Sequence, residues 1–167
     1  RSRPSFEDLV PIDPAPRLTL EHEGGPISSR MIDLFCPIGF GTRGLIVAPP
    51  KAGKTTLLRD IATSVSVNHP QVRIIAVLID ERPEEVTEFT RHVPGEVLAS
   101  SNDMDLETHT DLALFAYARA RRLLEAGEDV LFLVDSLTRL GRAFNNDRRY
   151  ATGGRTMSGG IDTMALD

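Results

Sequence analysis

Residues 44–56 read GLIVAPPKAGKTT, a short apolar run followed by a turn that ends in two threonines. Residues 48–55 fit the phosphate-binding pattern G-x-x-x-x-G-K-[ST] at every fixed position but the first, where Ala48 replaces glycine. In this pattern Gly53 lets the main chain approach the phosphates, Lys54 bridges the outer phosphates and Thr55 offers a hydroxyl to Mg²⁺. A chance Gly-Lys-Thr at a helix start is the alternative, but the flanking patterns favour nucleotide binding.

Apolar runs and helical spacing alternate from residue 44 onward. Short runs predict buried strands over 44–48, 74–79, 97–99 and 130–134. Helical spacing predicts helices over 54–67, 83–91, 105–126 and 137–145, the third with Ala113, Tyr117, Ala120 and Leu124 on one stripe. Residues 17–43, including the apolar stretch 31–35, are predicted as short strands or turns, and 146–160 as a loop. Strands that alternate with helices indicate an α/β fold with a mostly parallel sheet.

Acidic residues come just after two of these runs, at the sheet edge where ligands of parallel sheets bind. Glu81 follows 74–79 and is a candidate to orient or deprotonate an attacking water, with Arg82 beside it near the γ-phosphate. Asp135 follows 130–134, which is typical of the carboxylate that serves Mg²⁺ in phosphate-loop enzymes. The structural alternatives are an acidic first turn of a helix for Glu81 and a helix cap for Asp135.

Composition excludes several classes of protein. The 167 residues carry 19 Lys+Arg and 24 Asp+Glu, a net charge of −5, which excludes a generally basic nucleic-acid binder. The single cysteine, Cys36, excludes an intrachain disulfide framework and is expected to be a small buried side chain. The four histidines lack metal-ligand spacing, so packing or surface roles are expected for them. No apolar run approaches the roughly 20 residues of a membrane span, and no signal peptide is visible.

Positive charge gathers near the end of the sequence. Five arginines and one acid lie between residues 139 and 160, in a stretch rich in glycine. This basic loop is a candidate for contact with a phosphate backbone, where Tyr150 would stack on a base. A solvated arginine face or a contact between subunits accounts for the same residues equally well.

Four strings closely resemble the Rho family of bacterial transcription termination factors: GLIVAPPKAGKT (44–55), LIDERPEEVTE (78–88), LVDSLTRLGRAFN (133–145) and SGGIDTMAL (158–166). Alanine at the first position of the phosphate-binding pattern is what this family carries. The opening RPSFEDLVPI (3–12) and RLTLE (17–21) look like the family's connector into its motor domain. The resemblance covers nearly the whole chain and is weakest around residues 146–152.

The resemblance implies a RecA-like phosphate-loop ATPase fold, with a connector over 1–16 and the first part of the motor domain over 17–167. It implies a homohexamer of the bacterial cytoplasm that uses ATP and Mg²⁺ to move along single-stranded, preferably C-rich RNA and acts on the transcription machinery. No membrane association is expected. The chain is expected to be a piece of a longer protein, and weak or absent turnover is expected of the piece alone.

The resemblance also implies a role for individual residues. Glu81 would be the catalytic base, assisted by Lys54 and Arg82, and the metal would be held by Thr55 and Asp135. The nucleotide would contact Gly39, Phe40, Gly41, Thr42, Arg43, Gly44, Pro50, Lys51, Ala52, Gly53, Lys54, Thr55, Thr56 and Arg82. The loop from about Arg148 to Gly160 matches the family's RNA-channel loop and would contact RNA through Arg155, Thr156, Ser158 and Gly159, with Arg155 where the family commonly has lysine.

Two other classes of protein share parts of this pattern. Another RecA-like ring motor, such as a DNA helicase or a rotary or export ATPase, would share the strand-end motifs but is not expected to share the DERPEEV and SGGID strings. A nucleotide-binding or RNA-binding module without hydrolysis is the alternative outside the enzymes. This alternative predicts that Glu81→Gln leaves ATP binding intact, and that there is no ATP hydrolysis rate for the substitution to lower.

Overall fold

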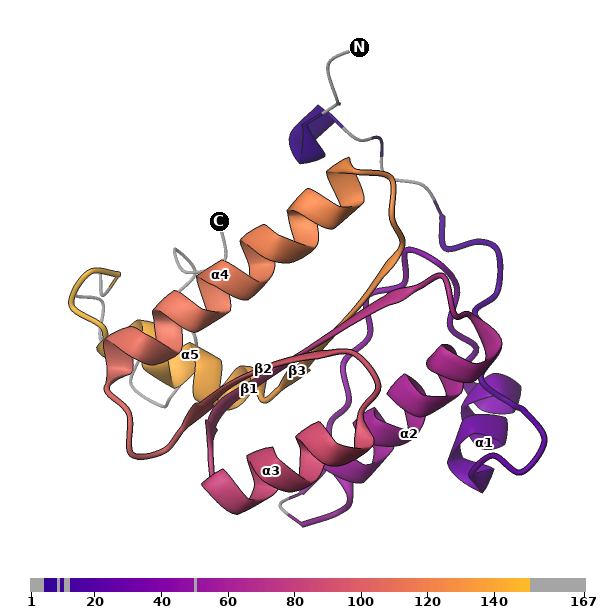
Figure 1. Cartoon of the computed structure of the whole chain (residues 1–167), viewed down its shortest axis with the longest axis horizontal. Helices are drawn as coiled ribbons and strands as arrows, with labels where there is room; N and C mark the ends of the chain where they lie inside the picture. Colours follow the sequence, from indigo (N-terminus) through magenta and orange to yellow (C-terminus); the bar gives the residue numbers. More distant parts are fainter. Residues whose placement is uncertain (1–4, 9, 11–12, 50, 151–167) are drawn as a thin grey trace. The chain divides into compact units, whose positions relative to one another are not determined.

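The computed structural model describes residues 5–8, 10, 13–49 and 51–150. The helices are the short 3-10 helix η1 (Phe6–Asp8), α1 (Ile27–Phe35), α2 (Lys54–Asn68), α3 (Pro83–His92), α4 (Leu106–Glu125) and α5 (Leu137–Asn146), and the strands are β1 (Arg73–Glu81), β2 (Glu96–Ser101) and β3 (Val130–Asp135) (Figure 1). The chain divides into two compact units, one of residues 1–74, 92–95 and 121–131 and one of residues 75–91, 96–120 and 132–167.

The sheet has the strand order β2-β1-β3, so β1 is the central strand. β1 and β2 are parallel, with Ile75 opposite Glu96. The backbone N–H of Arg73 donates to the carbonyl of Asp129 at 2.8 Å, which brings the beginnings of β1 and β3 together. Six consecutive residues of β1, 74–79, are buried, as the continuous apolar run predicts for a strand covered on both faces.

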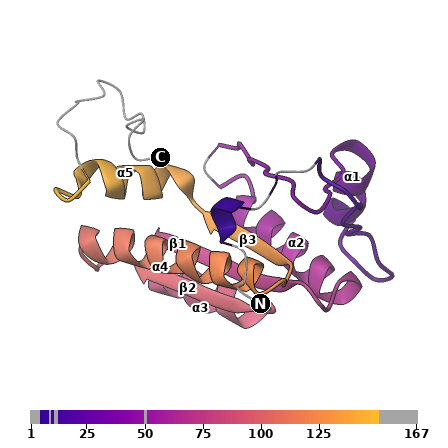
Figure 2. The same ribbon diagram turned by 90° about the horizontal axis from the view of Figure 1, so that it is seen from above.

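Helices α3 and α4 lie on opposite faces of the sheet (Figure 1). Along the sheet, the connection from β1 to β2 runs in one direction and the connection from β2 to β3 runs in the other. Because crossover connections are right-handed, the helices in these two connections must lie on opposite faces of the sheet. α4 buries His109, Thr110, Ala116 and Ala120. Of the predicted stripe, Ala120 is buried and Ala113 and Leu124 are half-buried, but Tyr117 is wrong, because it is 50% exposed and Ala116 is buried in its place. α5 lies beside the first half of α4 (Figure 2).

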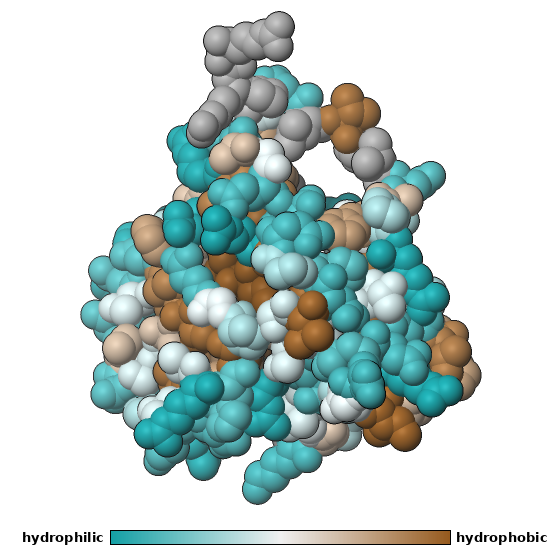
Figure 3. Space-filling view, turned by 45° about the vertical axis from the view of Figure 1, so that its right-hand side comes forward, coloured by the Kyte–Doolittle hydropathy of each residue, from teal (hydrophilic) through white to brown (hydrophobic). Residues whose placement is uncertain are grey.

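The prediction of strands or turns over 31–35 is wrong, because these residues belong to helix α1. α1 turns a polar face inward: Ser29 hydrogen-bonds Ser64 of α2 at 2.7 Å, and buried Asp33 accepts from the backbone of Leu20 and Glu21. Its apolar side chains point outward, among them Phe35 at 75% exposure, and apolar side chains reach the surface in patches (brown in Figure 3). Cys36, at the end of α1, is exposed, so the expectation of a buried side chain is wrong.

The predicted strand over 44–48 is also not observed, although the other three predicted strands are. Leu45 and Val47 are 70% and 84% exposed. A strand exists only when a neighbour accepts and donates its backbone hydrogen bonds, and no described residue pairs with this segment. Among the described residues, no helix has the length and apolar character needed to cross a membrane.

Part of the predicted connector over 1–16 is ordered against the end of α4. The backbone N–H of Phe6 donates to Glu125 at 3.1 Å, and the guanidinium group of Arg121 lies 5.0 Å from the centre of the Phe6 ring. Arg121 also forms an ion pair with Glu7. The hydrogen bonds from Ser5 and Arg121 lower the pKa of Glu7 to about 2. The segment therefore adds charged and aromatic contacts to the first unit.

Candidate nucleotide site

The predicted phosphate loop leads directly into α2. Gly53 is the N-cap of this helix with φ +88°, a left-handed conformation that glycine adopts at little cost, and Lys51 is also left-handed at φ +63°. In the part of the chain that the structure describes, no side chain caps this helix, and its first turn carries no acidic residue. Apart from the residues next to Gly53 and its own helix, no atom of the described residues lies within 4 Å of the position that a Cβ atom on Gly53 would take. A helix start of this kind fits an anion, because its N–H groups and dipole favour negative charge.

The side chains of the loop are arranged along this helix start. Lys54 and Thr55 are half-buried in the first turn, whereas Lys51, Ala52 and Thr56 are exposed. The backbone N–H of Ala52 donates to the carbonyl of Pro49 at 3.3 Å, which closes the turn. Pro50 lies outside the described residues. An ammonium and a hydroxyl beside a helix start are the donor set that a magnesium–phosphate group needs.

The upstream segment predicted to touch nucleotide has packing roles of its own. Gly39 and Thr42 hydrogen-bond each other in a turn, through Gly39 N to Thr42 Oγ1 at 3.0 Å and Thr42 N to the Gly39 carbonyl at 3.0 Å. A side chain on Gly39 would come within 2.8 Å of the Pro14 carbonyl, so glycine is needed there for close approach. The Phe40 ring packs edge-on against His69. Gly41, Thr42, Arg43 and Gly44 are exposed, and their contact with nucleotide stays a prediction.

Glu81 ends β1 at an irregularity of the sheet. Leu78 pairs with Ala99 but Glu81 pairs with Ser101, so β1 contains one extra residue there. Asp80 takes up this bulge with φ +57°, and its N–H donates to Ser100 Oγ at 3.4 Å. Bulges of this kind re-aim a side chain. Here the Glu81 side chain becomes buried, with 6% of the residue exposed.

Ser100 in turn hydrogen-bonds the buried ring of His109, through Nδ1 at 2.8 Å. The packing role expected for this histidine is therefore confirmed, and the bulge is supported from α4.

Arg139, in the first turn of α5, reaches back to this bulge. Its Nη1 lies 3.1 Å from Glu81 Oε1 and also donates to the carbonyl oxygen of Asp80. The pKa of Glu81 is raised above its ordinary value, chiefly because burial disfavours the charged form. The Arg139 charge and the Arg82 N–H oppose this rise, and a hydrogen bond from the Glu85 carboxyl group adds to it. A buried carboxyl group with raised pKa suits proton transfer near neutral pH.

Arg139 is a residue that the sequence reasoning missed. It was counted only as one charge of the basic stretch 139–160. The available signal was Ser136, which caps α5 and accepts from the backbone N–H of Arg139, and so fixes this arginine in the first turn after Asp135.

Asp135 is the last residue of β3 and is 4% exposed. β3 is the direct neighbour of β1, so Asp135 and Glu81 end adjacent strands whose axes are about 4.8 Å apart. Arg82 follows Glu81 with an exposed side chain. The second unit thus brings Glu81, Arg82 and Asp135 to one edge of the sheet, as predicted. The phosphate loop belongs to the other unit, and its meeting with these residues stays a prediction.

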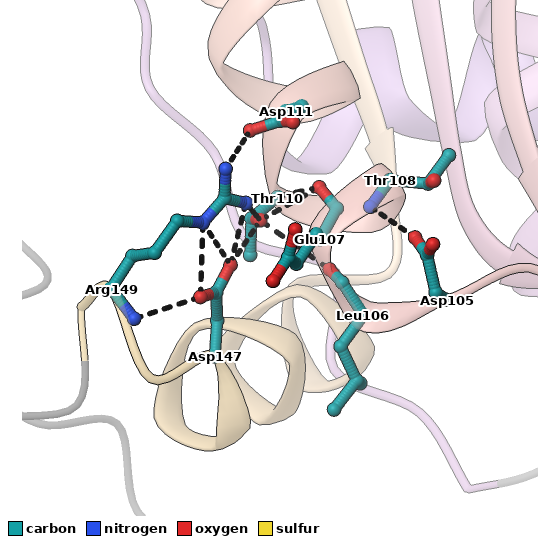
Figure 4. Close-up of polar contacts among 8 residues, drawn as sticks. All are labelled: Asp105, Leu106, Glu107, Thr108, Thr110, Asp111, Asp147 and Arg149. Atoms are coloured by element: carbon teal, nitrogen blue, oxygen red, sulfur yellow. Dashed lines mark hydrogen bonds and ion pairs between the residues drawn. The ribbon is translucent and has the colours of Figure 1, made fainter.

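The start of the predicted RNA loop is fixed by a polar cluster between α4 and α5 (Figure 4). The buried Asp147 carboxylate accepts from Thr110 Oγ1 at 2.7 Å and from the Arg149 backbone at 2.9 Å. Arg149 also pairs with Asp111 at 3.0 Å. Tyr150 packs edge-on against Phe144, with ring centres 5.2 Å apart.

Arg139 and Arg149, two of the five arginines of the basic stretch, are thus paired with carboxylates within the chain, and contact of the stretch with a phosphate backbone stays a prediction. Arg155, Thr156, Ser158 and Gly159 lie outside the described residues.

Comparisons with known proteins show the family of the chain. The family model of the ATP synthase alpha/beta family, nucleotide-binding domain, matches residues 28–147. Transcription termination factor Rho of Streptomyces coelicolor is 55% identical over 166 residues, which are 99% of this chain and 40% of that protein. Rho of Mycobacterium tuberculosis is 51% identical over 166 residues, which are 27% of its length. The chain therefore spans less than half the length of these relatives.

A solved ATPase from the type III secretion system of pathogenic bacteria has a similar structure. The TM-score is 0.70 at 24% sequence identity, over 93% of this chain and 46% of that one. The similarity concerns the fold, and together with the family match it confirms the predicted RecA-like α/β class.

Proposed function

Because the chain belongs to the ATP synthase alpha/beta family as a nucleotide-binding domain, we propose that it binds Mg-ATP and hydrolyses it as the first part of a Rho-type motor that moves on RNA and terminates transcription. The observation that carries the proposal is the buried Glu81 carboxyl group at the end of β1, beside the strand that ends at Asp135. A buried carboxylate at this sheet edge, with a phosphate loop in the same chain, is suited to phosphoryl transfer to water.

Each residue has a defined task in this proposal. Lys54 and the start of α2 hold the phosphates, and Thr55 and Asp135 hold the metal ion. Mg²⁺, when bound, neutralises charge that develops on the phosphate oxygens. Glu81 accepts a proton from the attacking water, and Arg82 stabilises charge at the γ-phosphate. The nucleotide contacts of residues 39–44 and 50–56 complete the site.

The proposal extends to the partners of the whole protein. We propose that the whole protein forms a homohexamer in the bacterial cytoplasm, binds single-stranded, C-rich RNA and acts on the transcription machinery. The similarity to transcription termination factor Rho supports the role in transcription. Residues 1–16 serve as the connector and 17–167 as the first part of the motor domain. Arg155, with Thr156, Ser158 and Gly159, contacts the RNA phosphates.

The test is the ATPase rate of the full-length protein with C-rich single-stranded RNA, with single-stranded DNA and without nucleic acid. Strong stimulation by RNA alone is expected, and Arg155→Ala should weaken this stimulation without loss of ATP binding. Equal or better stimulation by DNA, or a rate that ignores nucleic acid, would assign the site to another ring motor. ATP binding without turnover under all three conditions would assign it to a binding module.

A further inference from the structure

We propose that Arg139 is a positioning residue for Glu81: one guanidinium nitrogen holds both the bulged backbone before Glu81 and its carboxylate, and so aims the base at the water. This inference rests on the proposed function, because it assumes that Glu81 receives the proton. None of the family strings or strand-end motifs singles out Arg139 for this task.

The contacts of Arg139 are concentrated on one turn of the chain. Its Nη1 donates to the carbonyl oxygen of Asp80 and lies 3.1 Å from Glu81 Oε1. The Asp80 carbonyl belongs to the peptide bond that enters Glu81, so the arginine contacts this backbone unit and the Glu81 carboxyl group together. Asp80 is left-handed at φ +57°, a conformation that aspartate adopts more readily than most residues, and the Arg139 contact holds its carbonyl in this geometry.

Burial makes this support costly to lose. The Glu81 side chain is 8% exposed, and a carboxylate removed from water stays charged only beside a cation or hydrogen-bond donors. The charged or donor groups that act on it are Arg139 from α5, Glu85 from α3 and the backbone N–H of Arg82. Arg139 supplies the only positive side chain among these groups, so within the described residues it is the counter-ion of the base.

The place of Arg139 in the chain links the two carboxylates of the site. Asp135 ends β3, Ser136 caps α5 through the backbone N–H of Arg139, and the Arg139 side chain then reaches the end of β1. A displacement of Asp135 would therefore move Arg139 and with it Glu81. The contact of the guanidinium group with Oε1 limits the directions in which the Glu81 carboxyl group can turn toward a water.

The experiment is a double-mutant cycle on the ATPase of the full-length protein with saturating RNA, using Glu81→Gln, Arg139→Gln and the double variant. Arg139→Gln should lower kcat by roughly 10- to 100-fold, the effect of misplacing a catalytic group by about an ångström. KM for ATP should change little, because Arg139 is not assigned to nucleotide binding. The double variant should be no slower than Glu81→Gln alone, because Arg139 acts through Glu81.

Two further variants separate positioning from general damage. Arg91→Gln, a change of an exposed arginine near the end of α3, should keep wild-type kcat and KM. Arg139→Lys should recover part of the lost kcat, because a single nitrogen makes both contacts and an ammonium supplies one. Hexamer assembly, measured by gel filtration, and the thermal unfolding midpoint identify any variant that fails to fold. If Arg139→Gln fails to fold, the kcat of Arg139→Lys replaces it in the test.

The outcomes distinguish this inference from the proposed function. A near wild-type rate for Glu81→Gln overturns the role of Glu81 itself, and the positioning role with it. A slow Glu81→Gln with a wild-type Arg139→Gln overturns only the positioning role. The positioning role is also overturned if the decrease in kcat of the double variant equals the product of the decreases of the two single variants. It is overturned as well if Arg139→Gln changes only KM and leaves kcat unchanged.

Discussion

The guanidinium group of Arg149 encloses the carboxylate of Asp147, with Nε 3.1 Å from Oδ1 and Nη2 2.8 Å from Oδ2. Asp147 caps the C-terminal end of α5 and its side chain is fully buried, so this pair holds the end of α5 against α4 (Figure 4). Removal of the arginine would leave a buried carboxylate with Thr110 as its remaining side-chain donor. An uncompensated buried charge is strongly destabilising.

We therefore expect Arg149→Ala to lower the thermal unfolding midpoint by several degrees, measured by calorimetry at neutral pH. Arg148→Ala, the exposed neighbour, is the matched control and should leave the midpoint unchanged. Because Arg149 and Thr110 hold the pKa of Asp147 below its ordinary 3.8, the stabilising contribution is present above that pH and is lost on acidification. Equal midpoints for the two variants would contradict a structural role for the pair.

Glu81→Gln is expected to keep ATP binding and to lower the hydrolysis rate by about 10² to 10⁴, the usual contribution of a general base. The amide keeps the size of the side chain but accepts no proton. Binding of a fluorescent ATP analogue and the steady-state rate of the full-length protein measure the two effects separately. Glu84→Gln, an exposed carboxyl on the first turn of α3, should keep the wild-type rate. If Glu84→Gln hydrolysed ATP slowly and Glu81→Gln at the wild-type rate, the general base would be Glu84 and not Glu81.

The rate should also depend on pH through Glu81. Burial raises the pKa of its carboxyl group above the ordinary 4.5, and only the ionised form accepts a proton. As the pH falls, kcat should therefore decrease around a value higher than 4.5. A profile of kcat under saturating ATP, restricted to pH values where the protein remains folded, measures this. A rate that is constant down to pH 4.5 would mean that no buried carboxylate limits turnover.

Asp135→Asn should raise the Mg²⁺ concentration that gives half-maximal ATPase activity by roughly 10- to 100-fold, the range seen when support of a metal site is lost. The neutral amide keeps an oxygen ligand but lacks the negative charge that attracts a divalent cation. Asp129→Asn is the matched control, because this exposed aspartate precedes the same strand at its other end. An unchanged Mg²⁺ requirement for Asp135→Asn would leave this residue with a structural role.

Much of the fold follows from local patterns in the sequence. The apolar run of β1, the proline that begins α3 and the glycine after α4 are local signals, and the structure places these elements within two residues of their predicted bounds. The carboxylates Glu81 and Asp135 were found because a charge that interrupts an apolar run stands at a strand end. Such signals need no knowledge of distant residues.

The errors concern properties that depend on partners far along the chain. Residues 44–48 have the apolar content of a strand, but pairing requires a neighbour that composition does not reveal. Helix α1 was missed because its inward face carries Ser29 and Asp33 and its apolar side chains face outward, which inverts the usual pattern. Arg139 was missed because its partner, Glu81, is distant in sequence and near only after the sheet forms.

Lys54→Ala is expected to reduce ATP binding and turnover by at least about 100-fold, because a fixed positive charge at the phosphates is among the largest single contributions in such sites. Lys51→Ala, a change of the only other lysine, should weaken binding less, because this residue is exposed and precedes the start of α2. Equilibrium titration of the full-length protein with a fluorescent ATP analogue compares the two. If Lys51→Ala were the more damaging change, the phosphates would lie ahead of the helix and the assignment of Lys54 would be wrong.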